Sequence, residues 1–273
     1  PITDILNKSG SNTLIVMADN TFRIGAMWNW GGIRRPVTLK ILNKVNVDKQ
    51  HITGTPNLGS GGSNVLVKSS VYNHALTPAR LHLNLKIKLE GMEIVKASKT
   101  VSVGVNDTLT EFFNFNLDKK QTFLWHFDRP NIYDAELTVT DESNKVVAAK
   151  KSRFGIRKLE IKGTQMHLNG EPVKLMGYNY VPDDRITGNT FPEWRYKKDI
   201  DMMKEAGANM ARFSHLPLPE EVLDYLDEKG IMHYAEIPLW GSPNSLVNKN
   251  ELLPKIWLTK LVNSQFNHPA IRE

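Results

Sequence analysis

The periodicity of this sequence changes part-way along the chain, and that change constrains the fold more than any other feature. Up to about residue 157, apolar and polar residues alternate with a period of two, as in 64–72 and 80–89. Such alternation is typical of strands that place one face on a core. From about residue 173, short apolar runs alternate with segments of helical spacing. The chain therefore predicts an all-β part followed by an α/β part.

The all-β part contains about seven strand-like segments over roughly 110 residues, which predicts an immunoglobulin-like β-sandwich. Besides the two segments above, the candidates are 37–42, 97–105, 108–117, 134–140 and 146–154. The segment Gly59-Ser-Gly-Gly62 is a turn signal between strands. It precedes a strand rather than a helix, so a flexible loop is favoured over a phosphate-binding loop.

The α/β part begins after Asn169-Gly170, a dipeptide that predicts a two-residue hairpin because both residues tolerate a positive φ. The expected elements are a strand at 173–177, a helix opened by a capping box at 190–193 and closed by Gly207, a strand at 209–214, a helix at 219–229, a strand at 231–237, a helix around 253–264 and the approach to a fourth strand at 269–271. This order predicts parallel strands joined by right-handed crossovers. A closed barrel of eight such units needs about 250 residues. We therefore expect only the first part of a (β/α)8 TIM barrel.

Composition excludes several classes of function. Lys and Arg outnumber Asp and Glu by 35 to 29, and the excess lies in residues 1–157, with a net charge of +8 against −2 for 158–273. The basic residues stand singly on strand-like segments, which favours solvated sheet faces over a nucleic-acid surface. No apolar run is long enough to cross a membrane.

The types of residue also limit the chemistry. The chain has 0 Cys, and its 8 His residues show no metal-binding spacing. We therefore expect no disulfide, no metal site and no cofactor site. The absence of Cys leaves a periplasmic, secreted or cytoplasmic location open, and the start at Pro1 is compatible with a leader removed upstream.

Polar side chains follow the ends of three predicted parallel strands, where the loops of a barrel build its pocket. These candidate binding residues are Asn179, Asp183, Arg212, His215, Glu236 and Trp240. Two interpretations stay open for Arg212, a salt bridge inside the barrel with Glu236 or a contact in the pocket. His215 is either a structural histidine before Pro217 or a ligand contact. Trp240 fits stacking on the apolar face of a sugar, whereas Trp194 and Trp257 fit helix faces and are expected in the core.

Here the sequence resembles a known family. Asn209-Met-Ala-Arg-Phe-Ser-His-Leu-Pro217, continued by Asp227-Glu-Lys-Gly230 and Ala235-Glu236, resembles the first signature of glycoside hydrolase family 2, which contains β-galactosidases, β-glucuronidases and β-mannosidases. Further matching segments are Phe154-Gly-Ile-Arg157, the stretch from Leu168 to Asn179, Asp4-Ile-Leu6, Asn12-Thr-Leu-Ile-Val16 and Trp30-Gly-Gly-Ile-Arg34. The resemblance implies three domains: the last strands of a sugar-binding jelly roll (1–48), an immunoglobulin-like sandwich (49–157) and the N-terminal portion of a TIM-barrel catalytic domain (158–273).

The resemblance also implies an activity, the hydrolysis of terminal β-glycosidic bonds with retention by two Glu residues. Asn267-His-Pro-Ala-Ile271 resembles the start of the second signature, so both Glu residues are expected beyond Glu273 and no catalytic residue within the chain. Arg212 would orient the nucleophile, while Asn179, Asp183 and His215 would contact sugar hydroxyls.

Some residues depart from the family pattern and leave the sugar open. Phe213, Leu216 and His233 differ from the usual residues, and the stretch from Asn179 to Asp183 is nearer to β-mannosidases than to galactosidases. A β-galactoside, a β-mannoside and a β-glucuronide all remain candidates. A non-catalytic carbohydrate-binding or structural module is the alternative function. In either case two cut domains would leave open strand edges, so the chain is expected to need further sequence or self-association as a homo-oligomer.

Overall fold

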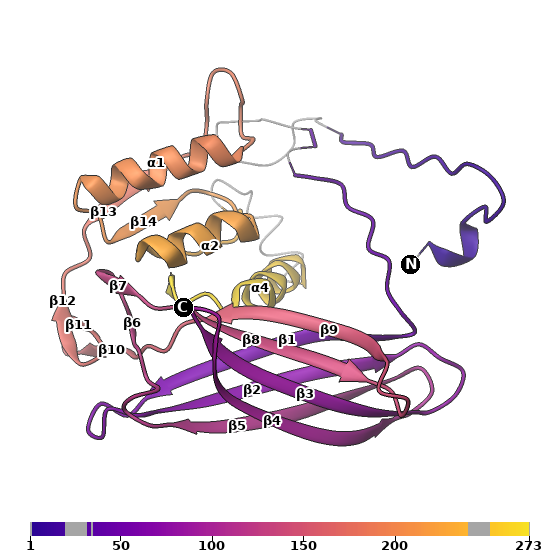
Figure 1. The fold of residues 1–273 in the computed structure, drawn as a ribbon. Helices are drawn as coiled ribbons and strands as arrows, with labels where there is room; N and C mark the ends of the chain where they lie inside the picture. Colours follow the sequence, from indigo (N-terminus) through magenta and orange to yellow (C-terminus); the bar gives the residue numbers. More distant parts are fainter. Residues whose placement is uncertain (1, 20–31, 34, 240–251, 273) are drawn as a thin grey trace.

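The computed structural model describes residues 2–19, 32–33, 35–239 and 252–272. A short 3-10 helix, η1 (Thr3–Ile5), precedes the first strand. The sandwich strands are β1 (Val45–Pro56), β2 (Ser63–Asn73), β3 (Ala79–Leu89), β4 (Met92–Val103), β5 (Asp107–Leu117), β8 (Tyr133–Thr140) and β9 (Val146–Phe154). They form two antiparallel sheets with the orders β1-β2-β5 and β4-β3-β8-β9, and a small β6 (Trp125–His126) and β7 (Arg129–Pro130) hairpin lies outside them (Figure 1).

The alternating pattern of the sequence explains how the two sheets pack. Val65 and Val67 of β2, Leu83 and Leu85 of β3 and Phe113 of β5 are all buried in one core shared by both sheets. Their neighbours along each strand point to the outer faces, because successive strand residues alternate between faces. Full burial of each such side chain contributes about 1.5–3 kcal/mol. The expectation of an antiparallel two-sheet unit is confirmed.

A further, three-stranded antiparallel sheet leads from the sandwich to the α/β part. It consists of β10 (Leu159–Lys162), β11 (Gln165–Leu168) and β12 (Glu171–Val173). Asn169 and Gly170 form the turn between the last two strands with φ values of 54° and 88°. The predicted two-residue hairpin is therefore confirmed. Both turn residues have the positive φ on which the prediction was based.

Four parallel strands follow in the order β13 (Gly177–Tyr180), β14 (Met210–Phe213), β15 (Met232–Tyr234) and β16 (Ile271–Arg272). The described helices among them are α1 (Glu193–Glu205), α2 (Glu220–Lys229) and α4 (Leu252–Gln265). Ile200 of α1 and Leu226 of α2 are buried against Ala211 and Phe213 of β14 in a second core. Strand, helix and parallel strand therefore alternate as expected, but the first parallel strand is Gly177–Tyr180 rather than 173–177, because residues 174–176 form no strand.

Several contacts join the sandwich to the parallel sheet. The buried Trp125 donates from Nε1 to the Asp227 carbonyl at the end of α2, at 2.9 Å. The Asn267 side chain, after α4, bonds the edge of β1: its Oδ1 accepts from Ile52 N at 2.9 Å and its Nδ2 donates to Gln50 O at 2.8 Å. The sandwich and the parallel sheet therefore pack directly against each other instead of being joined only by a flexible linker.

The structure differs from the expectations near the N-terminus. Residues 37–42 are exposed and form no strand, and the described residues before Val45 hold no strand either. An alternating segment needs a neighbouring strand to pair with, and the described residues offer none there. The seventh sandwich strand is instead β1, which begins at Val45 and so crosses the predicted domain boundary at residue 48. The jelly-roll assignment of 1–48 stays a prediction.

Two local expectations were also wrong. The residue before α1 is Pro192, with no side-chain cap, while the Thr190 hydroxyl donates to the Thr187 carbonyl, so no capping box forms. Trp194 is 63% exposed rather than in the core, because it lies on the outer face of α1. Among the described residues, no helix is long and apolar enough to cross a membrane.

Candidate functional site

Three of the predicted binding residues meet at the carboxyl ends of neighbouring parallel strands. Arg212 lies in β14, His215 follows that strand, and Glu236 follows β15. Arg212 Nη2 donates to Glu236 Oε2 at 2.6 Å, and His215 Nδ1 lies 2.9 Å from Glu236 Oε1. Both carboxylate oxygens of Glu236 are therefore engaged. The salt bridge between Arg212 and Glu236, one of the two interpretations of Arg212, is present.

The hydrogen-bond roles of His215 follow from these distances. Its Nδ1 also lies 3.2 Å from Arg212 Nη2. A carboxylate only accepts and a guanidinium only donates, so one proton on Nδ1 satisfies the contact with Glu236. The approach to Arg212 is then a contact between two donors rather than a hydrogen bond.

Asn179 joins this cluster from β13. It is paired with Arg212 in the register of the parallel sheet, so both side chains lie on the same face. Its Oδ1 accepts from Arg212 Nη1 at 3.0 Å and from Ser214 Oγ at 2.5 Å. Four side chains from three strands therefore form one hydrogen-bonded group, which we call the strand-end cluster: Asn179, Arg212, His215 and Glu236. Ser214 supports it, a role that the sequence indicated only by position.

The other two predicted residues are not part of this group. Asp183 follows β13 by three residues, is half-buried, and bonds to none of the cluster residues. Its Oδ1 is inaccessible and has no hydrogen-bond partner in the described part of the chain. A buried carboxylate oxygen without a partner is costly unless something else bonds it. Trp240 lies outside the described residues.

The loop that carries Asp183 is held by Arg195, which the sequence analysis missed. This arginine of α1 is only 5% exposed. Its Nη1 donates to Thr187 Oγ1 at 3.0 Å, to Gly188 O at 3.2 Å and to Thr190 O at 3.1 Å. The i,i+4 spacing of Arg195 and Asp199, whose Nε and Oδ2 lie 3.7 Å apart, was the available signal.

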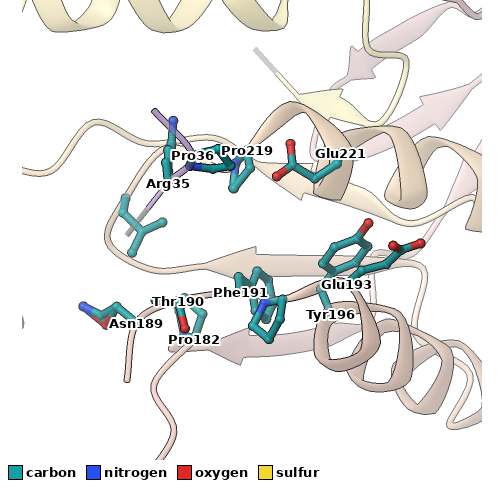
Figure 2. A pocket seen from close by; sticks show the side chains of 12 residues that line it. Arg35, Pro36, Pro182, Asn189, Thr190, Phe191, Glu193, Tyr196, Pro219 and Glu221 are labelled. Carbon is teal, nitrogen blue, oxygen red and sulfur yellow. The ribbon is translucent and has the colours of Figure 1, made fainter. Parts of the chain in front are cut away.

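A cavity of about 520 Å³ lies between the loops that follow β13 and β14, and none of the four cluster residues is among those that line it. Figure 2 shows Arg35, Pro36 and Pro219 on one side of it and Thr190 and Phe191 on the other. The Arg35 guanidinium donates to the carbonyl of Pro217, so the N-terminal segment is attached to the loop that carries His215. No local pattern indicates this contact, because Arg35 and Pro217 are far apart in the chain.

One group of side chains in the described residues has the composition of a metal site, namely Asp224, Asp227 and His268. Its bonds point to a structural role instead. Asp227 Oδ2 lies 2.6 Å from His268 Nδ1, and its Oδ1 accepts from Ala270 N at 2.9 Å. Arg153 Nη1 lies 3.2 Å from Asp224. The carboxylate oxygens are thus already neutralised or bonded by the protein.

Burial and charge shift the protonation of this group. Burial raises the pKa of Asp227 above its ordinary value, even though the bond from His268 opposes the shift. Burial alone would lower the pKa of His268, but the hydrogen bond and charge of Asp227 outweigh it, and the pKa is raised. Asp227 and His268 therefore titrate as a coupled pair inside the junction between the sandwich and the parallel sheet.

Comparison with protein families agrees with this architecture. Residues 45–157 match the family model described as glycosyl hydrolases family 2, and residues 159–271 match the one described as glycosyl hydrolases family 2, TIM barrel domain. The chain belongs to glycoside hydrolase family 2. Its parallel strands are therefore the start of a TIM barrel domain, and the strand-end cluster lies at the barrel face where active sites of this architecture are built.

Relatives of the chain are named as glycosidases. It is 28% identical over 245 residues to a β-galactosidase of Thermoanaerobacter pseudethanolicus, covering 89% of the chain and 32% of that protein. It is 24% identical over 286 residues to a β-glucuronidase of Streptococcus agalactiae, covering 98% and 43%. Among solved structures, a family 2 β-galacturonidase from Eisenbergiella tayi matches with a TM-score of 0.80 at 20% identity, over 93% of the chain and 45% of that structure. The chain spans about a third of the length of the first curated relatives it matches.

Proposed function

We propose that this chain provides one wall of the sugar pocket of an exo-acting β-glycosidase. The observation that carries the proposal is the strand-end cluster, a charged and hydrogen-bonded group at the carboxyl ends of three barrel strands. The reaction is the hydrolysis of a terminal β-glycosidic bond with retention of configuration. The two reacting Glu residues are those that the family resemblance places beyond Glu273. Relatives named as β-galactosidases and β-glucuronidases support the class of substrate.

Within the cluster, Glu236 acts on its neighbours rather than on the substrate. Both of its oxygens are bonded, one to Arg212 and one to His215. A carboxylate whose two oxygens are both bonded in this way orients the side chains that bond it. It is therefore a poor nucleophile and a good positioning residue.

Arg212 is the group that would face a second carboxylate. A guanidinium has five N–H donors. Among the described residues, Arg212 donates one from Nη1 to Asn179 and one from Nη2 to Glu236. The remaining donors can hold the attacking carboxylate of a retaining glycosidase in place and keep it ionised. Two carboxyl groups about 5–5.5 Å apart then perform the two displacements.

Sugar hydroxyls would be bound by the edges of the cluster. Asn179 is exposed, and its amide nitrogen donates to no residue that the structure describes, so it can bond a hydroxyl. The Oδ1 of Asp183 is inaccessible, so only its Oδ2 could meet a sugar hydroxyl. Because a carboxylate accepts from hydroxyls but repels a second carboxylate, Asp183 favours a neutral β-galactoside or β-mannoside over a β-glucuronide at its position.

Activity measurements test this proposal. The reading frame continued past Glu273 should encode an Asn-Glu pair after a Trp-containing strand, and its product should hydrolyse p-nitrophenyl β-D-galactopyranoside or β-D-mannopyranoside. The proton NMR spectrum of the first product formed should show the β anomer. Hydrolysis with inversion, or a frame that lacks the pair, would contradict the proposal.

The alternative, a non-catalytic carbohydrate-binding module, predicts a different result for the chain itself. A binding module should give saturable heat on calorimetric titration with methyl β-glycosides, and Arg212→Ala should abolish that heat. One wall of a pocket should bind such small glycosides too weakly to saturate. Titration of the 273-residue chain therefore separates the two functions.

A further inference from the structure

A second cavity lies on the sandwich, away from the strand-end cluster. It has a volume of about 660 Å³ and is formed by the turn between β1 and β2, the ends of these strands and of β5, and Lys158. Its wall is the Gly-rich segment that the sequence predicted as a flexible loop. The structure shows a closed turn instead: Asn57 N donates to Gly62 O and Gly61 N donates to Asn57 O, both at 2.8 Å.

The side chain of Asn57 stiffens this turn further. Its Oδ1 accepts from the backbone N–H groups of Gly59 and Ser60, each at 3.1 Å. On the outer side, Leu58 Cδ1 lies 3.0 Å from where a Cβ would stand on Gly170, in the hairpin that leads to the barrel. The wall is thus fixed in the folded protein and packed against the barrel entry, so the cavity is largely preformed.

The lining of this cavity is polar but nearly uncharged. Besides apolar and glycine residues, it consists of the hydroxyl and amide side chains of Thr55, Asn57, Ser60, Ser63, Asn64 and Asn116. Lys158 also lines it, but its ammonium group lies 2.9 Å from Glu160, which compensates the charge. A chain with a net charge of +6 thus presents a neutral hydrogen-bonding cavity.

The amide groups at its edge are arranged to donate outward. Asn64 Nδ2 donates to Asn114 Oδ1 at 2.6 Å and to Asn116 Oδ1 at 3.0 Å. With their carbonyl oxygens held in this way, the amide nitrogens of Asn114 and Asn116 donate to no residue that the structure describes. Both side chains are exposed, so these donors are available to acceptors of a ligand.

The same face of β5 continues to an exposed aromatic ring. Phe112 lies on that face together with Asn114 and Asn116, since alternate residues of a strand share a face. It is 50% exposed, and Leu66 of the neighbouring β2 is 37% exposed. Phe112 and Asn116 are four positions apart, which corresponds to about 14 Å along the strand. The strip is therefore longer than a single sugar ring.

We propose that this cavity and the strip from Asn116 to Phe112 bind a neutral oligosaccharide chain. Aromatic and aliphatic side chains pack on the C–H faces of sugar rings, while amides and hydroxyls bond their hydroxyl groups. The cavity lining offers an anionic ligand no uncompensated cation. At the far end of the strip, Lys68 Nζ lies 5.9 Å from the centroid of the Phe112 ring, so the preference for a neutral ligand rests on the cavity. An apolar peptide would leave the outward amide donors without partners, which is costly. This binding site does not depend on the proposed activity of the barrel.

Affinity electrophoresis of the 273-residue chain tests the proposal directly. Native gels that contain a neutral galactan or a neutral β-glucan should retard the chain, whereas polygalacturonate at raised salt should not. Phe112→Ala and Asn116→Ala should each raise the polysaccharide concentration for half-retardation roughly tenfold. Both residues are exposed, so circular dichroism spectra and melting temperatures should match those of the parent chain.

Two control variants give the experiment its specificity. Trp194→Ala removes an aromatic ring that is 63% exposed on α1, far from the strip, and should leave retardation unchanged. Arg212→Ala alters the strand-end cluster and should also leave it unchanged. Loss of retardation in Arg212→Ala would place binding in the barrel and overturn the proposal. Three other results would also overturn the proposal. They are no retardation of the chain by either neutral polymer, retardation by polygalacturonate alone, and equal retardation of Phe112→Ala and the parent chain.

Discussion

Arg212 Nη2 and Glu236 Oε2 lie 2.6 Å apart across two neighbouring barrel strands, and the Glu236 side chain is 15% exposed. A half-buried ion pair of this kind holds its partners in place more than it stabilises the fold. We expect a double-mutant cycle with Arg212→Met and Glu236→Gln, measured by urea unfolding, to give a coupling energy of about 1 kcal/mol. The pair Lys86 and Glu93, on the surface of the sandwich, is the control. Equal coupling in both pairs would contradict a special role for the cluster pair.

The two glycines that end α1 and α2 should respond differently to the same substitution. Gly207 and Gly230 both have a positive φ, of 85° and 63°. A Cβ on Gly207 would meet nothing within 4 Å, whereas on Gly230 it would lie 2.2 Å from the Phe127 carbonyl oxygen. Gly207→Ala should therefore cost about 1–2 kcal/mol, the penalty of the left-handed conformation alone. Gly230→Ala should cost clearly more, and similar losses in chemical denaturation would refute this account.

Burial of His233 should make the fold sensitive to acid. Its side chain is 0% exposed, and burial lowers its pKa to about 4, although a bond to the Ala211 carbonyl opposes the shift. The unfolded chain binds a proton near pH 6.5 and the folded one near 4, so the free energy of unfolding should fall as the pH decreases through this window. Each unit of pKa difference is worth about 1.4 kcal/mol, so the free energy of unfolding should fall by about 3 kcal/mol across this window.

Unfolding curves at pH 7, 6, 5 and 4 measure this effect. His233→Leu should flatten the pH dependence, whereas His74→Gln, which changes an exposed histidine, should retain it. A parallel pH dependence in the parent chain and in His233→Leu would assign acid sensitivity to other groups.

The junction between the sandwich and the barrel should depend on Asp227. Its carboxylate is buried and bonds His268 and the backbone of Ala270. Asp227→Ala leaves the imidazole of His268 without its partner inside the protein, which we expect to cost about 3–5 kcal/mol. Glu205→Ala, at an exposed end of α1, should change the stability by less than about 0.5 kcal/mol. Differential scanning calorimetry gives both values.

The parallel sheet presents aromatic residues to solvent. Tyr178 and Tyr234 are 48% and 44% exposed, and β13 and β16 bound the sheet on its two sides within the described residues. Open edges and exposed rings favour association. Light scattering should show a mass that rises with concentration, and Tyr178→Ser with Tyr234→Ser should weaken the rise. A stable monomer at all concentrations would argue against this expectation.

Local patterns were sufficient for most of the fold. The alternation of apolar and polar residues predicted the buried faces of β2, β3 and β5. Asn169-Gly170 predicted the hairpin between β11 and β12, because the geometry of such a turn depends on two adjacent residues only. Residues 37–42 have the same alternation and no strand, since a strand also needs a partner that local sequence cannot supply.

The candidate site was likewise only partly predictable from the sequence. Barrel topology brings the ends of parallel strands together, so Asn179, Arg212 and Glu236 could be grouped from their positions. Arg35 could not, because its partner is a backbone carbonyl, which leaves no residue-specific signal in the sequence. Arg195 left only its i,i+4 spacing to Asp199, since its other partners include two backbone carbonyls. Asp183 and Trp240 stay predictions as binding residues.

The bonds of Asn267 to the edge of β1 have a consequence for assembly. An outer strand with open backbone groups can act as a template onto which another chain adds a strand. Here an amide side chain occupies the N–H of Ile52 and the carbonyl of Gln50, the groups that an added strand would use. The side of the sandwich that faces the barrel is therefore capped against growth by strand addition, and copies of this chain must meet elsewhere.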